Sequence, residues 1–262
     1  MRKSIKGSRL WRAAAILALT VLWCGPAAAQ AMFGTECQSD FQNGWLPTAP
    51  EVWTRCSWFN DALGDLDRLM FYYNLVGAKP WWEDTLDQGE LETVALIYAN
   101  THGGAWSDRS VWAMWDDHSN AQSTSMRLGD ESWKLSILAT YACETMKFND
   151  GKLWTRMGPI FRGGLLFAAG SQDQVVDSTT TNETGEDFAD DLQHRWAIKD
   201  AWADGNSDWS EDQDVAVMAT GNGSLADCEA RRDGMTWQNY IYYPRYRDAD
   251  ANYYCYWYWE NL

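Results

Sequence analysis

The stretch ILATYACETM, residues 137–146, is a short apolar run that ends at a cysteine and then becomes polar. Three further runs have the same character: LETVALIYAN at 91–100, GGLLFAAG at 163–170 and DQDVAVMATG at 212–221. Short unbroken apolar runs that alternate with helical or loop segments are typical of parallel strands buried on both faces. The sequence therefore predicts an α/β fold, a mostly parallel sheet with helices on both faces.

The segments between these runs are predicted from residue spacing. Apolar residues at helical intervals predict one helix within residues 60–78, which Gly77 would end, and a second amphipathic helix over 185–205. Residues 32–56 have no sustained period, and we expect an irregular entry segment closed by a disulfide. Residues 101–131 are predicted as loops with at most a short helix.

The first residues have the pattern of a secretory signal peptide. Basic residues precede the apolar run at 13–23, and CGPAAAQA at 24–31 offers small residues for cleavage after Ala29 or Ala31. No other apolar run is long enough to span a bilayer. We therefore expect a secreted or periplasmic, soluble protein, with a leader at 1–29 and one domain over 30–262.

The charge balance limits the classes of partner. The chain has a formal net charge of −16, and the leader holds five of its 21 basic residues and none of its 37 acidic ones. Nucleic acids and anionic membranes require a positive surface, so neither is an expected partner. The 18 tryptophans are compatible with binding of peptides or glycans, although most large aromatic residues fill cores.

The cysteine count leaves one thiol over. Removal of the leader leaves five cysteines, an odd number for an oxidising compartment. Pairing neighbours in sequence gives Cys37–Cys56 and Cys228–Cys255 and leaves Cys143, although sequence alone cannot fix the connectivity. A leftover thiol in an exported protein is either buried and inert or free because it has a function.

Two of the apolar runs end at residues that can carry out chemistry. His102, followed by Gly103 and Gly104, comes just after the run at 91–100, and Cys143 ends the run at 137–142. In α/β sheets, functional groups gather at the carboxyl ends of the strands. If the two strands are neighbours, an imidazole and a thiol could meet there, as a base-activated nucleophile requires.

These two motifs, VALIYANTHGG and LSILATYAC, resemble those of the caspase, legumain, gingipain and clostripain clan of cysteine peptidases. The order of the motifs is the same, and the resemblance extends over about residues 60–221. The sequence also resembles exported bacterial proteins that have the same two motifs. The resemblance implies a caspase-like fold in which Cys143 attacks a peptide carbonyl and His102 protonates the leaving amine. It further implies an oxyanion hole formed by the backbone N–H groups of Gly103 and Cys143.

The sequence departs from the clan where specificity is concerned. Some members that cleave after basic residues have an aspartate two positions before the cysteine, where this chain has Tyr141, and the caspase QACRG context is absent. Cleavage specificity therefore cannot be transferred. Asp173 and Asp177, in the loop after the third run, are candidate walls of a pocket for a basic side chain.

Other candidate groups have weaker patterns. Part of a calcium loop is present at 204–212, without the glycine at its sixth position and the glutamate at its twelfth, so an acidic linker is the alternative. The four oxygen-bearing residues are Asp204, Asn206, Asp208 and Asp212. His118 and His194 are expected to be solvated. No other metal or cofactor is expected.

The leading hypothesis is an exported cysteine peptidase that hydrolyses peptide bonds with a Cys143/His102 dyad. The alternative is a binding or interaction module on the same fold whose dyad is catalytically silent. The two differ in whether the imidazole of His102 is presented to the sulfur of Cys143 across an open site.

Overall fold

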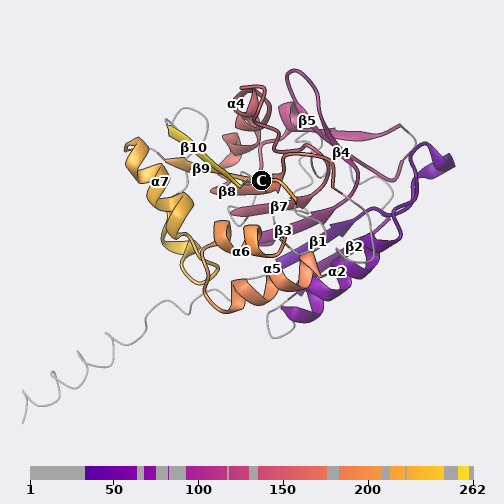
Figure 1. Cartoon of the computed structure of the whole chain (residues 1–262), viewed down its shortest axis with the longest axis horizontal. Helices are drawn as coiled ribbons and strands as arrows, with labels where there is room; N and C mark the ends of the chain where they lie inside the picture. The colour runs from indigo at the N-terminus through magenta and orange to yellow at the C-terminus, as the bar shows by residue number, and fades with distance from the viewer. Residues whose placement is uncertain are drawn as a thin grey trace, which may run out of the picture. The chain divides into compact units, whose positions relative to one another are not determined.

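The computed structural model (Figure 1) describes residues 33–63, 68–74, 82, 93–116, 118–129, 135–175, 183–207, 213–221, 223–244 and 253–259. The predicted leader lies outside the described residues. Within the described part of the chain, no helix has the length and apolar character needed to cross a membrane.

The centre of the fold is a seven-stranded sheet with helices on both faces, which confirms the predicted fold class. All neighbouring strands pair in parallel except at β9, which is antiparallel to both β8 and β10. The order across the sheet is β10 (Tyr253–Trp259), β9 (Val215–Gly221), β8 (Phe167–Ser171), β7 (Ile137–Tyr141), β3 (Leu96–Asn100), β1 (Phe33–Cys37) and β2 (Arg68–Tyr73).

The four apolar runs form β3, β7, β8 and β9, and every residue of these four strands is buried. Strands covered on both faces lose their alternation of polar and apolar residues, which explains why the runs are continuous. The prediction of strands at these four places is confirmed.

The prediction of an irregular segment at 32–56 is wrong at both ends. Phe33–Cys37 is the buried strand β1, between β3 and β2, and Glu51–Ala62 is the helix α2. The sequence FGTEC conceals its burial because it contains Thr35 and Glu36. Both find partners far away in sequence: Asn60 Nδ2 donates to Thr35 Oγ1 at 3.2 Å, and Trp82 Nε1 donates to the Glu36 carboxylate.

The helix predicted within 60–78 is also wrong. The helix α2 ends at Ala62, and Arg68–Tyr73 is the strand β2, which pairs with β1. Aromatic residues such as those of RLMFYY favour strands, and this preference prevailed over a spacing that also fits a helix.

One face of the sheet is covered by α2, α5 (Thr184–Gln193) and α6 (Ile198–Asp204) (Figure 1). An aromatic stack holds this layer together: the ring of Phe59 on α2 lies 4.5 Å from that of Tyr98 on β3 and 6.0 Å from that of Phe188 on α5. The single helix predicted over 185–205 is two helices, because Arg195 has a left-handed φ of 68° and Ala197 is extended.

The opposite face carries α4 (Leu153–Met157), the 3-10 helix η4 (Gly158–Gly163) and a small antiparallel sheet. The small sheet consists of β4 (Gly103–Ala105), β5 (Ser110–Ala113) and β6 (Asn120–Gln122). The prediction of loops over 101–131 is therefore wrong for this part. Trp112 on β5 is fully buried and stacks on Trp82, with 5.6 Å between the ring centroids.

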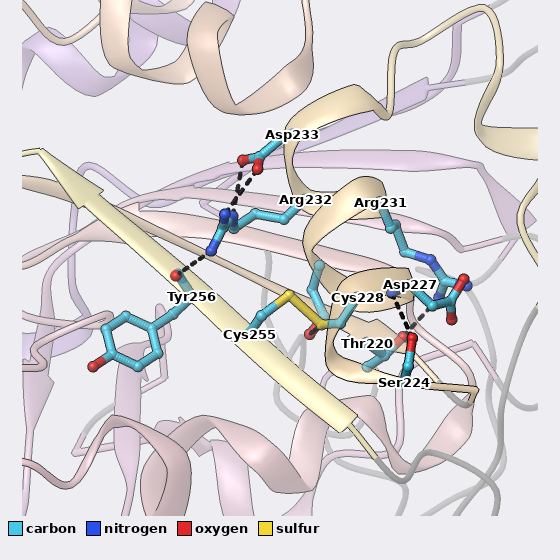
Figure 2. The surroundings of a disulfide bond; sticks show 10 residues. Thr220, Ser224, Asp227, Cys228, Arg231, Arg232, Asp233, Cys255 and Tyr256 are labelled. Atoms are coloured by element: carbon cyan, nitrogen blue, oxygen red, sulfur yellow. Dashed lines mark hydrogen bonds and ion pairs between the residues drawn. A yellow bond between two sulfur atoms is a disulfide. The ribbon is translucent and has the colours of Figure 1, made fainter.

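Both predicted disulfides are present, Cys37–Cys56 and Cys228–Cys255. The first joins the end of β1 to α2. The second joins α7 (Leu225–Gly234) to β10, and Figure 2 shows Cys255 facing that helix. Since cytosolic proteins rarely keep disulfides, two buried ones fit the expected oxidising compartment.

Candidate active site

His102 and Cys143 lie just beyond the ends of two strands that are neighbours in the sheet. Strands β3 and β7 pair in parallel, with Asn100 opposite Tyr141. Each candidate residue is two positions past this pair, and the Thr101 N–H reaches the Tyr141 carbonyl at 3.4 Å. The two strands are thus neighbours, which is the condition under which the imidazole and the thiol could meet.

Gly103 packs directly against the turn that carries the cysteine. A Cβ atom on Gly103 would lie 2.8 Å from the Cys143 carbonyl oxygen and 2.9 Å from both Ala142 Cβ and Thr145 Cγ2. Two of these atoms belong to short, rigidly held groups, so no side chain fits without moving the turn. Glycine is required here by close approach rather than by a left-handed backbone.

The chain turns sharply immediately after Cys143. Glu144 has a left-handed φ of 52°, a conformation that costs a non-glycine residue about 1–3 kcal/mol. The turn is held by the neighbouring strand end: the Glu144 N–H donates to the Asp173 carbonyl at 2.8 Å and the Met146 N–H to the Ser171 carbonyl at 2.9 Å. Glu144 also forms an ion pair with Lys147. Strain that is maintained in this way is common at functional sites.

Cys143 is the free cysteine among the described residues, and it is half-buried. Burial raises the pKa of its thiol above the ordinary value, and backbone groups of Val175, Gly103 and Cys143 itself partly oppose the shift. No helix begins at the turn, since α4 starts only at Leu153. A helix N-terminus therefore does not lower the pKa of this thiol, and burial favours its protonated form.

The imidazole of His102 is oriented by a backbone carbonyl. Its Nε2 lies 2.9 Å from the Pro47 oxygen, and because a carbonyl can only accept, Nε2 carries the hydrogen. In the neutral ring, Nδ1 is then the basic nitrogen. The ring of Phe41 lies 5.2 Å from the imidazole, at an angle of 35°, and packs against it.

Pro47 and Phe41 belong to the segment 38–50, which the Cys37–Cys56 disulfide closes. The segment is also tied by backbone bonds, from Ala49 N–H to the Ser39 carbonyl at 2.8 Å and from Gln42 N–H to the Trp115 carbonyl at 2.8 Å. Sequence reasoning missed this contribution. A carbonyl oxygen is common to every residue, so a contact made 55 positions away leaves no signal.

A pair of carboxyl groups lies beside the turn. The Asp173 carbonyl accepts from Glu144, so Asp173 is next to Cys143 in space. Burial raises the pKa of the Asp173 carboxyl, and a hydrogen bond with Asp214 and its charge raise it further. Asp214 had no signal in the sequence. The other predicted pocket residue, Asp177, lies outside the described residues.

The remaining candidates are not brought together with this site. Asp204 is exposed at the end of α6 and Asn206 is buried just after it, while Asp208 and Asp212 lie outside the described residues. In the described ranges, no group of three His, Cys, Asp or Glu side chains could hold a metal. His118 and His194 are exposed, as predicted, and the ring of His118 lies 5.5 Å from that of Trp45.

Comparisons with known proteins place the chain in a family. A family model described as a domain of unknown function (DUF6345) matches residues 69–261, more than half of the chain, so the chain belongs to this family. No curated protein matches.

Among solved structures, the chain is similar to caspases. The insect Spodoptera frugiperda caspase-1 is 9% identical, with a TM-score of 0.44 over 68% of this chain and 77% of that one. The Drosophila initiator caspase Dronc is 10% identical, with a TM-score of 0.46 over 74% and 85%. At these values the function has to be argued from the site itself.

Proposed function

We propose that this chain of the DUF6345 family is an exported cysteine peptidase in which Cys143 is the nucleophile and His102 the general base and acid. The observation that carries the proposal is the arrangement at the ends of β3 and β7. A free, half-buried thiol stands on one strand end, and an imidazole whose Nε2 is held by the Pro47 carbonyl stands on the next. A nucleophile, a base and a group that orients the base are the parts that covalent acyl transfer requires.

The proposed reaction begins with the thiol in its neutral form. His102 Nδ1 takes the proton from Cys143 Sγ as the sulfur attacks the carbonyl carbon of the scissile peptide bond. The carbonyl oxygen becomes an oxyanion, and the N–H groups of Gly103 and Cys143, which are close to the sulfur, are the proposed donors to it. His102 then gives its proton to the leaving amine.

The acyl group remains on Cys143 as a thioester. A water molecule, deprotonated by His102, attacks the thioester carbonyl and releases the new carboxyl end. The proton returns to the sulfur as the thioester bond breaks, which restores the starting state. Because burial raises the pKa of the thiol, the proposed mechanism relies on His102 to take its proton.

The proposed substrate class is a peptide with a basic side chain near the cleaved bond. Support comes from Asp173 and Asp214, which share a hydrogen bond next to the Cys143 turn. A cation placed between them would favour ionisation of both carboxyl groups, whereas an acidic side chain would be repelled. Asp177 remains a proposed further wall of this pocket.

The experiment is a fluorogenic peptide library screened against the chain, together with mapping of iodoacetamide labelling. We expect cleavage and selective alkylation of Cys143. Cys143→Ala should abolish cleavage, and His102→Ala should lower it by at least about 10²-fold. His194→Ala, a change to an exposed histidine just after the end of α5, is the matched control and should have no effect.

Full activity of Cys143→Ala would contradict the proposal. An unreactive Cys143, with no turnover by the wild type but binding of a peptide that survives in the Cys143→Ala/His102→Ala double variant, would support the silent binding module instead. Circular dichroism of each variant separates loss of chemistry from loss of fold.

A further inference from the structure

A cavity of about 560 Å³ lies between α4 and β10. Its buried lining is apolar, with Leu153 from α4, Met218 from β9 and the disulfide residue Cys255 from β10. None of the described residues that line it carries a charge. Its size falls within the range of about 300–1,000 Å³ that is usual for small-molecule sites.

Aromatic rings form the walls of this cavity. Phe148 and Tyr254 pack against the core, while Trp154 is 47% exposed and Tyr256 is 51% exposed. Large aromatic residues that stay exposed on one face of a protein usually mark a binding surface. The site is therefore apolar inside and open to solvent at its rim.

A second cavity, of about 460 Å³, adjoins the first and has one positively charged side chain in its lining. The two cavities share Trp154 and Tyr254, whose ring centroids are 3.6 Å apart, so they meet at this ring pair. Arg162 from η4 lines the second cavity and is exposed. Among the described residues, its guanidinium has no hydrogen bond or ion pair, unlike Arg156, which is bound to Asp150.

The walls of the site are held in place by the fold. On one side, β10 is fixed by the Cys228–Cys255 disulfide, and Arg232 Nη1 donates to the Tyr256 carbonyl at 2.8 Å. Figure 2 shows the Tyr256 side chain pointing away from α7. On the other side, Trp154 lies over Gly158, where a Cβ would be 3.2 Å from the indole ring. A preformed site loses less entropy when a ligand binds.

We propose that these two cavities form a single elongated binding site for a long-chain aliphatic carboxylate. The carboxylate would pair with Arg162, and the chain would run past Trp154 and Tyr254 into the apolar cavity. The charge of the protein favours this assignment: the net charge is −16, so Arg162, which has no ion pair with a described residue, is a local positive group that would attract an anion to the apolar cavity. None of the residues that line these cavities belongs to the proposed catalytic centre.

The test is isothermal titration calorimetry with sodium dodecanoate and with dodecyltrimethylammonium, which have the same chain and opposite charges. We expect saturable one-to-one binding of dodecanoate and at least tenfold weaker binding of the cation. N-acetylphenylalanine, an aromatic carboxylate of peptide type, should bind more weakly than dodecanoate. Equal affinity for the two detergent-like ions, no binding of dodecanoate, or preference for N-acetylphenylalanine would overturn the proposal.

Variants assign the binding to this site. Arg162→Gln should weaken dodecanoate binding by about tenfold or more, because a charged hydrogen-bond partner is lost. Arg195→Gln removes an exposed arginine in the turn between α5 and α6 and should change nothing. Tyr256→Ala should weaken binding, while Tyr242→Ala, at a tyrosine 80% exposed outside the cavities, should not. Unchanged binding in Arg162→Gln would also overturn the proposal.

Discussion

The two disulfides close loops of similar length toward opposite edges of the sheet, yet they hold different parts of the molecule. Cys37–Cys56, with a sequence separation of 19, closes the segment that orients His102. Cys228–Cys255, with a separation of 27, ties α7 to the edge strand β10. One disulfide thus stabilises the segment beside the proposed catalytic site, and the other stabilises the edge of the sheet.

The largest difference is expected when each disulfide is removed. In the chain-entropy model, loops of these lengths each contribute about 3 kcal/mol, so Cys37→Ala/Cys56→Ala and Cys228→Ala/Cys255→Ala should lose similar free energies of unfolding. Peptidase turnover should separate them. We expect a fall of about 10²-fold in the first variant, because the Pro47 carbonyl is no longer held at His102, and less than about twofold in the second.

The measurement pairs urea unfolding with turnover of one fluorogenic peptide, at a temperature where both variants stay folded. Equal losses of turnover would show that the Cys37–Cys56 disulfide acts only through stability, and the proposed difference between the regions would then be wrong.

A second contrast concerns the carboxylates of the two regions. Burial raises the pKa of Glu36 on β1 to about 7, and hydrogen bonds from Trp82 and Gln38 only partly oppose this. Near the second disulfide, hydrogen bonds from Arg232 and Lys199 lower the pKa of Asp233 to about 2. Of these two carboxyl groups, Glu36 is therefore the one whose ionisation should change near neutral pH.

The sign follows from the raised pKa of Glu36. The folded state holds this proton more tightly than the unfolded one, so its stabilising effect is complete below about pH 4.5 and is lost as the pH rises to about 7. The loss is at most about 3 kcal/mol. Glu36→Gln should reduce the decline in the free energy of unfolding between pH 5 and pH 8, measured in urea. An unchanged decline would show that Glu36 does not titrate in this range.

Glu36 also shows which part of the fold cannot be predicted from the sequence. The strands β3, β7, β8 and β9 were predictable because each lies in a run of consecutive apolar residues, which indicates burial on both faces. Strand β1 was not, because Glu36 receives a hydrogen bond inside the fold from Trp82, which is 46 positions away in sequence. Such a pairing is a tertiary event that local propensity does not encode.

The candidate site divides in the same way. Cys143, His102 and Gly103 follow strand ends, and their order and the odd cysteine made them predictable. The Pro47 carbonyl has no side-chain signature, and Asp214 was not distinguishable from the other acidic residues of a chain that has 37. Burial raises the pKa of Cys143 and a backbone group of Val175 partly opposes the rise, and neither effect can be read from the neighbours of Cys143 in sequence.

A smaller effect is expected from the aromatic residue beside His102. Phe41→Leu keeps an apolar side chain in a position that is 6% exposed but removes the ring that packs on the imidazole. We expect kcat to fall by about tenfold with little change in KM, because the orientation of the base is affected rather than substrate binding. The matched change Tyr258→Leu, at an exposed ring that stacks on Phe148, should leave both constants unchanged. A change confined to KM would contradict a positioning role for Phe41.

The smallest effect is expected where the two disulfide-linked helices begin. Helix α7 starts after Ser224, whose side chain accepts from the Asp227 N–H at 3.1 Å, while α2 starts after Pro50 without a side-chain cap. Ser224→Ala should lower the free energy of unfolding by about 1 kcal/mol and leave turnover unchanged, since α7 contacts the sheet at β9 and β10. Unfolding and turnover of this variant measure the two effects separately. If Ser224→Ala lowered turnover, the C-terminal region would be coupled to the strand ends at β3 and β7 through the sheet, and the separation of the two regions would no longer hold.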